Sequence, residues 1–358
     1  MATVVLAGGG TAGHVEPALA VARQWKVSHP HDRLVFLGTT TGLENTLVPA
    51  ANFELHFIPR VRISRKPSPS WLKIPFDLIS SVRASKKVIK DADVVIGFGG
   101  YVSAPAYLAA KMTRTPIVIH EANAKPGWAN RLGSRFSQHL AVAHPVDSGR
   151  FENALLAGLP LRSDVSQAFI DSRTNWEQSR RQAKVRLGFP VDTPLIFVMG
   201  GSQGSVAINA VIASMVETFN EQGLSVLHSV GKLNSLPEAS GGYRAVAYVE
   251  AMADAYLAAD VVIGRSGAVT CSEFRALGRY ALFVPLPIGN GEQFVNAASL
   301  VADKRAEVVS QSNFTKEFLK NNIAGLLSKS AQAPIQGNGT DLESAAKIVA
   351  LAEFAMKK

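Results

Sequence analysis

Two glycine-rich turns have the composition of anion-binding sites. Residues 8–14 read GGGTAGH and residues 200–205 read GGSQGS, and each turn follows an apolar strand and precedes a helix. Glycines let backbone N–H groups approach a ligand, and the start of a helix adds free N–H groups and the positive end of a dipole. The first turn is therefore predicted to lie beside a phosphate group, and the second repeats its strand–turn–helix context.

A third candidate site lies in residues 259–296, which place a strand, a glycine-containing turn, a helix start and a second strand in succession. The helix carries Glu273 in its first turns, and Glu292, Gln293 and Asn296 follow the second strand. The carboxyl ends of neighbouring parallel strands meet at one edge of a sheet, where α/β proteins bind ligands. We expect a diphosphate pocket there.

Two side chains in the first half are candidates for acid–base chemistry. His14 comes directly after the glycines at the start of a helix, where an imidazole can face a ligand. A capping or packing histidine is the alternative, and the two are about equally favoured. Glu121, in the HEAN segment that follows an apolar strand, is the second candidate, although a His–Glu pair is common in ordinary loops.

A dinucleotide site has to be considered because Gly8, Gly10 and Gly13 satisfy G-x-G-x-x-G. The next predicted strand, however, ends in Gly38-Thr39-Thr40, with no acidic residue where a ribose hydroxyl requires an acceptor. NAD is therefore disfavoured as a ligand. An oxidoreductase remains an alternative, and it would be favoured if NAD but not UDP stabilised the protein.

Internal symmetry indicates how these segments are positioned. The hexapeptide ADVVIG occurs at 92–97 and again at 259–264, and each half begins with a strand, a glycine turn and a helix. The pattern predicts two doubly wound, Rossmann-like α/β domains that face each other across a cleft. We place the domains at 1–161 and 162–340, and expect the terminal helix, 341–358, to pack back on the first.

Composition sets outer limits. A chain of 358 residues that is 47% hydrophobic exceeds what one core usually organises. The single Cys271 excludes a disulfide framework, and no apolar run is long enough to span a membrane. The net charge of +9 predicts an acidic partner. A cytosolic protein without an export signal is expected.

Residues 60–90 combine many cations with apolar side chains. Apolar side chains can enter the acyl boundary of a membrane while neighbouring lysines and arginines contact anionic headgroups. A solvated helix face is the more ordinary interpretation, and nucleic acid is a weaker one. The predicted membrane contact comprises Arg65, Lys66, Trp71, Leu72, Lys73, Ile74 and Phe76.

The motifs GGGTAGH, FGGYVSAP, HEAN, GGSQGS, GRSGAVTCSE and EQFVNA, in this order over nearly the whole chain, resemble those of the MurG family of membrane-associated N-acetylglucosaminyltransferases. The resemblance implies the GT-B fold. It also implies inverting transfer of N-acetylglucosamine from UDP-GlcNAc to the C4 hydroxyl of MurNAc in lipid I, undecaprenyl-diphosphate-MurNAc-pentapeptide, which gives lipid II for peptidoglycan synthesis.

The resemblance also implies roles for individual residues. His14 becomes the candidate base, with Glu121 kept as a second catalytic candidate from the residues alone, and Glu273 becomes an acceptor for both ribose hydroxyls. The remaining UDP-GlcNAc-binding positions are Thr11, Ala12, Gly13, Asn123, Arg162, Ser202, Val249, Ala268, Val269, Thr270, Cys271, Ser272 and Gln293. Of these, Cys271 is interpreted as a small packing residue and not as a nucleophile. Neither a metal nor a cofactor is expected, because helix dipoles and arginine can carry the charge of the leaving group.

Four positions depart from the family pattern. Many relatives have Gly at Ala12, Gln at Ala122, Asn at Leu159 and Gln at Glu292. A peripheral location on the cytoplasmic face of the cell membrane is expected, with lipid I, anionic lipids and cell-wall synthesis proteins as partners, and no nucleic acid. Three alternatives remain: a glycerolipid acceptor, sugar-nucleotide epimerisation, and a silent sugar-nucleotide-binding subunit.

Overall fold

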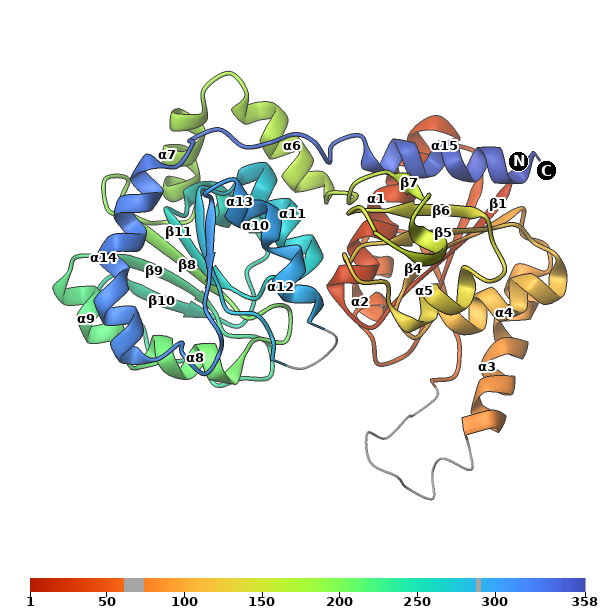
Figure 1. The fold of residues 1–358 in the computed structure, drawn as a ribbon, viewed down its shortest axis with the longest axis horizontal. Coiled ribbons are helices and arrows are strands. Elements are labelled where there is room, and N and C mark those ends of the chain that lie inside the picture. The colour runs from red at the N-terminus through yellow and green to blue at the C-terminus, as the bar shows by residue number, and fades with distance from the viewer. Residues whose placement is uncertain (61–73, 288–290, 358) are drawn as a thin grey trace. The chain divides into compact units, whose positions relative to one another are not determined.

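The structure, a computed structural model, describes residues 1–60, 74–287 and 291–357. The chain forms two compact units, Met1–Arg162 with Asp341–Lys358 and Ser163–Thr340 (Figure 1). Arg162, which we expected to open the second domain, belongs to the first unit by this division.

Unit 1 is a parallel sheet covered by helices on both faces. Its seven strands are hydrogen-bonded in the order β3-β2-β1-β4-β5-β6-β7. The strands are β1 (Thr3–Gly8), β2 (Arg33–Gly38), β3 (Glu54–Phe57), β4 (Val94–Gly99), β5 (Ile117–Glu121), β6 (His139–Val142) and β7 (Leu155–Leu156). The helices are α1 (Ala12–Ser28), α2 (Glu44–Ala50), α3 (Ile74–Ile89), α4 (Ser103–Thr113), α5 (Trp128–Gly133) and α15 (Ser344–Met356).

Unit 2 repeats this topology with six strands in the order β10-β9-β8-β11-β12-β13. The strands are β8 (Leu195–Met199), β9 (Ser225–Ser229), β10 (Tyr243–Val246), β11 (Val261–Gly264), β12 (Tyr280–Phe283) and β13 (Ala306–Val308). The helices are α6 (Ser163–Ser172), α7 (Trp176–Arg186), α8 (Val206–Ala213), α9 (Val216–Glu221), α10 (Met252–Ala258), α11 (Ala268–Leu277), α12 (Glu292–Asn296), α13 (Ala298–Ala302) and α14 (Lys316–Gln332).

The two copies of the repeated hexapeptide occupy equivalent places. In each unit the repeat forms the strand, β4 or β11, that lies beside the first strand of that unit and on the opposite side from the second. This is the switch point of a doubly wound sheet, where the loops after the two central strands diverge and leave room for a ligand. The predicted fold, two Rossmann-like α/β units, is confirmed.

Helix α15 belongs to the core of unit 1. Ile348, Val349, Ala352 and Ala355 are buried in the same cluster as residues of α1 and of the central strands. Just before this helix, Asp341 Oδ1 accepts the backbone N–H of Leu159 at 3.2 Å. The segment that leaves unit 1 and the segment that returns to it are therefore hydrogen-bonded to each other.

Across the described ranges, none of the helices combines the length and the apolar character that crossing a lipid bilayer requires.

Candidate active site

The glycine turn between β1 and α1 holds His14. Thr11 is the N-cap residue, and its Oγ1 lies 3.2 Å from Nδ1 of His14 in the first turn of the helix. The half-buried ring packs on Gly99 and Gly100, whose φ angles are +90° and +76°. A Cβ atom on Gly100 would lie 2.4 Å from the Gly9 carbonyl oxygen and 3.1 Å from His14 Nδ1. The seat of the imidazole therefore requires glycine.

This environment favours the uncharged form of the imidazole. Burial lowers the pKa of His14 below its ordinary value of 6.5, against the opposing effects of a hydrogen bond with the Gly9 backbone and of the Glu44 charge. An unprotonated imidazole can accept a proton from a hydroxyl group.

Glu44 is a residue of this site that the sequence analysis did not identify. Its carboxylate is fully buried and accepts the N–H of Gly10 at 2.8 Å, in the turn that precedes His14. The negative charge opposes a second anion at that N–H, which agrees with the argument against a dinucleotide. The available signal was an acidic residue at the start of a helix that follows a strand and a glycine-containing loop.

Glu121 lies at the end of β5, and its two oxygens are occupied by donors of the loop that follows. Oε1 accepts the backbone N–H and the side-chain amide of Asn123 at 2.9 and 3.2 Å, and Oε2 accepts Gly127 N and Asn130 Nδ2, both at 2.9 Å. Burial raises the pKa of Glu121 although these hydrogen bonds oppose the shift. The carboxylate fixes the loop that carries Asn123.

The same network reaches the histidine. Tyr107 OH donates to Asn130 Oδ1 at 2.7 Å. A Cβ atom on Gly99 would lie 3.3 Å from Asn130 Nδ2 and 3.2 Å from His14 Cδ2, so both side chains pack on this one glycine. Asn130 and Tyr107 are further residues that the sequence analysis missed, because their partners are 9 and 23 positions away.

In unit 2, the turn between β8 and α8 and the turn between β11 and α11 both end in helix starts. Ser202 is half-buried in the first turn, and Ser205 caps α8 by accepting Ile208 N. Beside them lies Arg265, directly after β11, whose burial lowers its pKa. A buried cation next to two helix N-termini favours an anionic ligand.

The segment Ala268–Glu273 forms the first half of α11. Ala268, Cys271, Ser272 and Glu273 are buried, and Val269 and Thr270 are half-buried. Burial raises the pKa of the Cys271 thiol to about 12, which leaves it unreactive. Gln293, in α12, accepts Leu286 N of the loop after β12 through its Oε1 at 2.9 Å, and its carbonyl accepts Ser266 Oγ at 2.8 Å. These bonds bring Gln293 to the turn that precedes α11.

The remaining predicted residues are distributed as follows. Val249 is buried between β10 and α10. Arg162 is in unit 1 and pairs with Glu16 of α1 at 3.8 Å. Of the predicted membrane contact, Ile74 and Phe76 are in α3, whereas Arg65, Lys66, Trp71, Leu72 and Lys73 lie outside the described residues. Among the residues that the structure describes, no cluster of three or more His, Cys, Asp or Glu side chains is arranged to hold a metal ion.

Two doubly wound units, each with a glycine turn at its switch point, have the architecture of GT-B glycosyltransferases. Residues 4–142 match the Glycosyltransferase family 28 N-terminal domain and residues 195–351 match the Glycosyltransferase family 28 C-terminal domain. The chain belongs to glycosyltransferase family 28, and the resemblance to the MurG family is confirmed.

Curated relatives match over most of the chain. A protein of Rhodococcus erythropolis is 42% identical over 94% of this chain and 89% of its own length, and one of Thermobifida fusca is 41% identical over 98% and 94%. Both are named UDP-N-acetylglucosamine--N-acetylmuramyl-(pentapeptide) pyrophosphoryl-undecaprenol N-acetylglucosamine transferase.

Solved structures support the fold. The crystal structure of Acinetobacter baumannii MurG superposes with a TM-score of 0.70 at 27% identity and covers 99% of this chain and 100% of that one. A UDP-GlcNAc 2-epimerase of Neisseria meningitidis reaches a TM-score of 0.58 at 16% identity, over 98% of both chains, and shares the fold alone.

Proposed function

We propose that the protein transfers N-acetylglucosamine from UDP-GlcNAc to the C4 hydroxyl of MurNAc in lipid I, with inversion, and so forms lipid II for peptidoglycan synthesis. The names of its relatives describe this activity. The observation that carries the proposal is the His14 imidazole in the glycine turn of unit 1, packed on Gly99 and Gly100 with Nδ1 beside Thr11 Oγ1.

His14 acts as the base in a single displacement. With Nδ1 beside Thr11 Oγ1, Nε2 is the nitrogen that takes the proton of the C4 hydroxyl. The hydroxyl oxygen forms a bond to the anomeric carbon while the bond from that carbon to the diphosphate oxygen breaks, and UDP leaves. Glu121 holds the loop of Asn123 in place through the four bonds described above, and Asn123 contacts the N-acetylglucosamine.

Unit 2 binds the donor and stabilises the leaving group. The starts of α8 and α11, with Arg265 between them, supply fixed positive potential to the diphosphate without a metal ion. Ser202 and Arg162 bind near the diphosphate, and Gln293 contacts the donor sugar. Residues 268–273 surround the nucleotide, with Glu273 at the ribose and Val249 presenting its backbone to the base.

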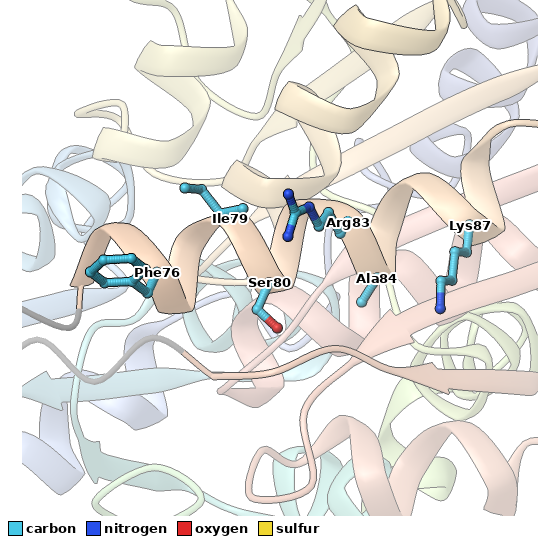
Figure 2. Close-up of a pocket in the computed structure, with 6 residues that line it drawn as sticks. All are labelled: Phe76, Ile79, Ser80, Arg83, Ala84 and Lys87. Carbon is cyan, nitrogen blue, oxygen red and sulfur yellow. The ribbon is translucent and has the colours of Figure 1, made fainter.

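Helix α3 brings the enzyme to the cytoplasmic face of the membrane, where a prenyl-linked acceptor resides. Its Phe76 and Ile79 side chains are 74% and 48% exposed. Figure 2 shows the face of α3 that borders a depression of about 560 Å³, lined by Phe76, Ile79, Ser80, Arg83, Ala84 and Lys87. Apolar side chains near the N-terminal end of α3 and cations farther along suit an anionic lipid surface.

UDP release from UDP-GlcNAc, with and without a short-chain lipid I analogue in detergent, tests the proposal. Release that depends on the analogue and yields the disaccharide lipid is the expected result. Turnover of UDP-GlcNAc without the analogue would point to an epimerase, and binding without turnover would point to a different acceptor or to a silent subunit. Either outcome would overturn the proposed function.

A further inference from the structure

The Glu44 carboxylate joins the ends of two neighbouring strands. Glu44 opens α2, and its side chain is 0% exposed. Oε1 accepts the backbone N–H and the hydroxyl of Thr39, after β2, at 2.8 and 2.9 Å, and Oε2 accepts Gly10 N, after β1, at 2.8 Å. Three hydrogen bonds on one carboxylate hold the two loops in a single arrangement.

Three glycines leave the space that this carboxylate fills. A Cβ atom on Gly42 would lie 2.1 Å from Glu44 Oε2, one on Gly9 3.0 Å from Oε1, and one on Gly38 2.5 Å from Cγ. Real side chains do not tolerate contacts as short as 2.1 or 2.5 Å, so the cavity has the shape of this one side chain.

The anchored turn is the one that seats the base. Gly9 hydrogen-bonds the His14 ring through its backbone, Gly10 donates to Glu44, and Thr11 contacts Nδ1. The Glu44 charge acts on the imidazole in the direction that favours its protonated form. Glu44 therefore has both a mechanical and an electrostatic connection to His14.

We propose that Glu44 is a positioning residue for the transfer reaction: its buried carboxylate fixes the glycine turn that seats His14 and supplies the negative charge that stabilises this imidazole when it gains a proton. The proposal rests on the proposed function, in which His14 is the base. Glu44 acts through the turn and does not touch the substrate.

Ionisable groups on the neighbouring elements have partners of their own. On α1, Glu16 pairs with Arg162. In the loop after β3, Arg60 donates to Thr41 Oγ1 at 3.0 Å. After β4, Tyr101 donates to the Pro59 carbonyl, and at the end of β5, Glu121 is bonded to its own loop. Glu44 is hydrogen-bonded to the turn that holds His14, and its charge favours the protonated imidazole.

The test is Glu44→Gln, which keeps the size of the side chain and removes its charge. We expect kcat to fall roughly tenfold or more with KM for UDP-GlcNAc little changed. We also expect the acid limb of the kcat profile to move to lower pH, because the imidazolium loses its stabilising charge. Thr39→Val is the matched control: it removes one bond to Oε1 but keeps the charge, so stability falls while the acid limb stays in place.

Glu44→Asp and a direct titration complete the design. Glu44→Asp retains the charge on a shorter side chain, so it should lose rate without moving the acid limb as far as Glu44→Gln. NMR can follow the titration of His14 in the wild type and in Glu44→Gln, with His14→Ala used to assign the signal. This measurement reports the change in the His14 pKa without any turnover.

Equal His14 titration in wild type and Glu44→Gln would overturn the proposal, as would an acid limb that moves equally in Glu44→Asp. An inactive wild type with a shifted His14 titration would instead reject the proposed function and leave the Glu44–His14 coupling standing.

Discussion

Arg265 Nη2 donates to Ser205 Oγ at 2.8 Å and so joins the end of β11 to the N-cap residue of α8. The same guanidinium donates to the carbonyls of Val284 and Pro285, after β12, and to Gln311 Oε1. These four partners are all uncharged acceptors. The positive charge is thus held by geometry at the edge of the sheet and remains available to an anionic ligand.

Arg265→Gln should weaken both stability and donor binding. Buried acceptors that lose a donor cost about 1–3 kcal/mol, and the loss of the charge should weaken UDP binding roughly tenfold. Urea unfolding and calorimetric UDP titration measure the two effects. Arg181→Gln, which removes an exposed ion pair with Asp192, is the control and should leave UDP affinity unchanged. Wild-type UDP affinity in Arg265→Gln would contradict the prediction.

His14→Ala should reduce kcat by about 10²–10⁴-fold while UDP-GlcNAc binding is retained. In the wild type, activity should be lost as pH falls through the pKa of His14, because the base must be unprotonated. Since burial lowers that pKa, the acid limb should lie below pH 6.5. A pH series of initial rates measures this. His29→Ala, on an exposed pair with Glu353, should retain activity, and a His14→Ala enzyme with unchanged kcat would exclude His14 as the base.

Gly100→Ala should displace the imidazole. The new Cβ atom would meet the Gly9 carbonyl, and the φ of +76° adds strain of about 1–3 kcal/mol. The midpoint temperature of thermal unfolding and kcat should both fall. Gly325→Ala, in α14, is the control, because its Cβ meets open space and replacing a helical glycine stabilises by about 0.5–1 kcal/mol. Full activity in Gly100→Ala would show that the turn can shift without disturbing His14.

Acid should destabilise the fold through two buried histidines. Burial lowers the pKa values of His120 and His228 to about 4, whereas the unfolded chain takes up these protons near 6.5. The stabilisation that each neutral histidine contributes is therefore fully present above pH 6.5. It is lost as pH falls towards 4, with a slope of about 1.4 kcal/mol per pH unit for each histidine. Urea unfolding at several pH values measures the slope. His228→Gln should flatten it, whereas exposed His31→Gln should not.

Phe76→Asp should weaken binding to anionic vesicles by about ten- to a hundredfold, because it removes an exposed phenylalanine from α3. Vesicle co-sedimentation measures the change, with UDP affinity as a check that unit 2 is intact. Phe354→Asp, at a 52% exposed aromatic on α15, is the matched control. Equal losses in both variants would show that α3 is not a specific contact.

The fold was predictable because its signals are local. A strand, a glycine turn and a helix start are adjacent in the sequence, and the repeated hexapeptide reveals the symmetry. Details differ where tertiary contacts decide. The repeated hexapeptide occupies 92–97, but β4 is Val94–Gly99, because Gly99 pairs with Gly8 and Phe98 is buried. The terminal helix was predicted at 341–358 and spans Ser344–Met356.

The site was predictable only in part. His14 and the 268–273 segment are found by their neighbours in the sequence. Glu44 is not, because its partner Gly10 is 34 positions away, and an acidic residue at a helix start does not by itself indicate that its carboxylate is buried. Arg265 was visible as a turn residue, but its bonds to Ser205 and Gln311 span 60 and 46 positions. Such roles depend on contacts that only the folded chain creates.

The path of the chain sets an order for folding during synthesis. Unit 2 is one continuous segment, whereas the core of unit 1 includes Ile348 and Ala352 of α15, which follow residues 163–340 in the chain. Until α15 emerges from the ribosome, the apolar faces of α1 and β4 that it covers remain open to solvent. Since domains generally fold as units, unit 2 can finish first, and the nascent unit 1 is the part of the chain that a chaperone would have to protect.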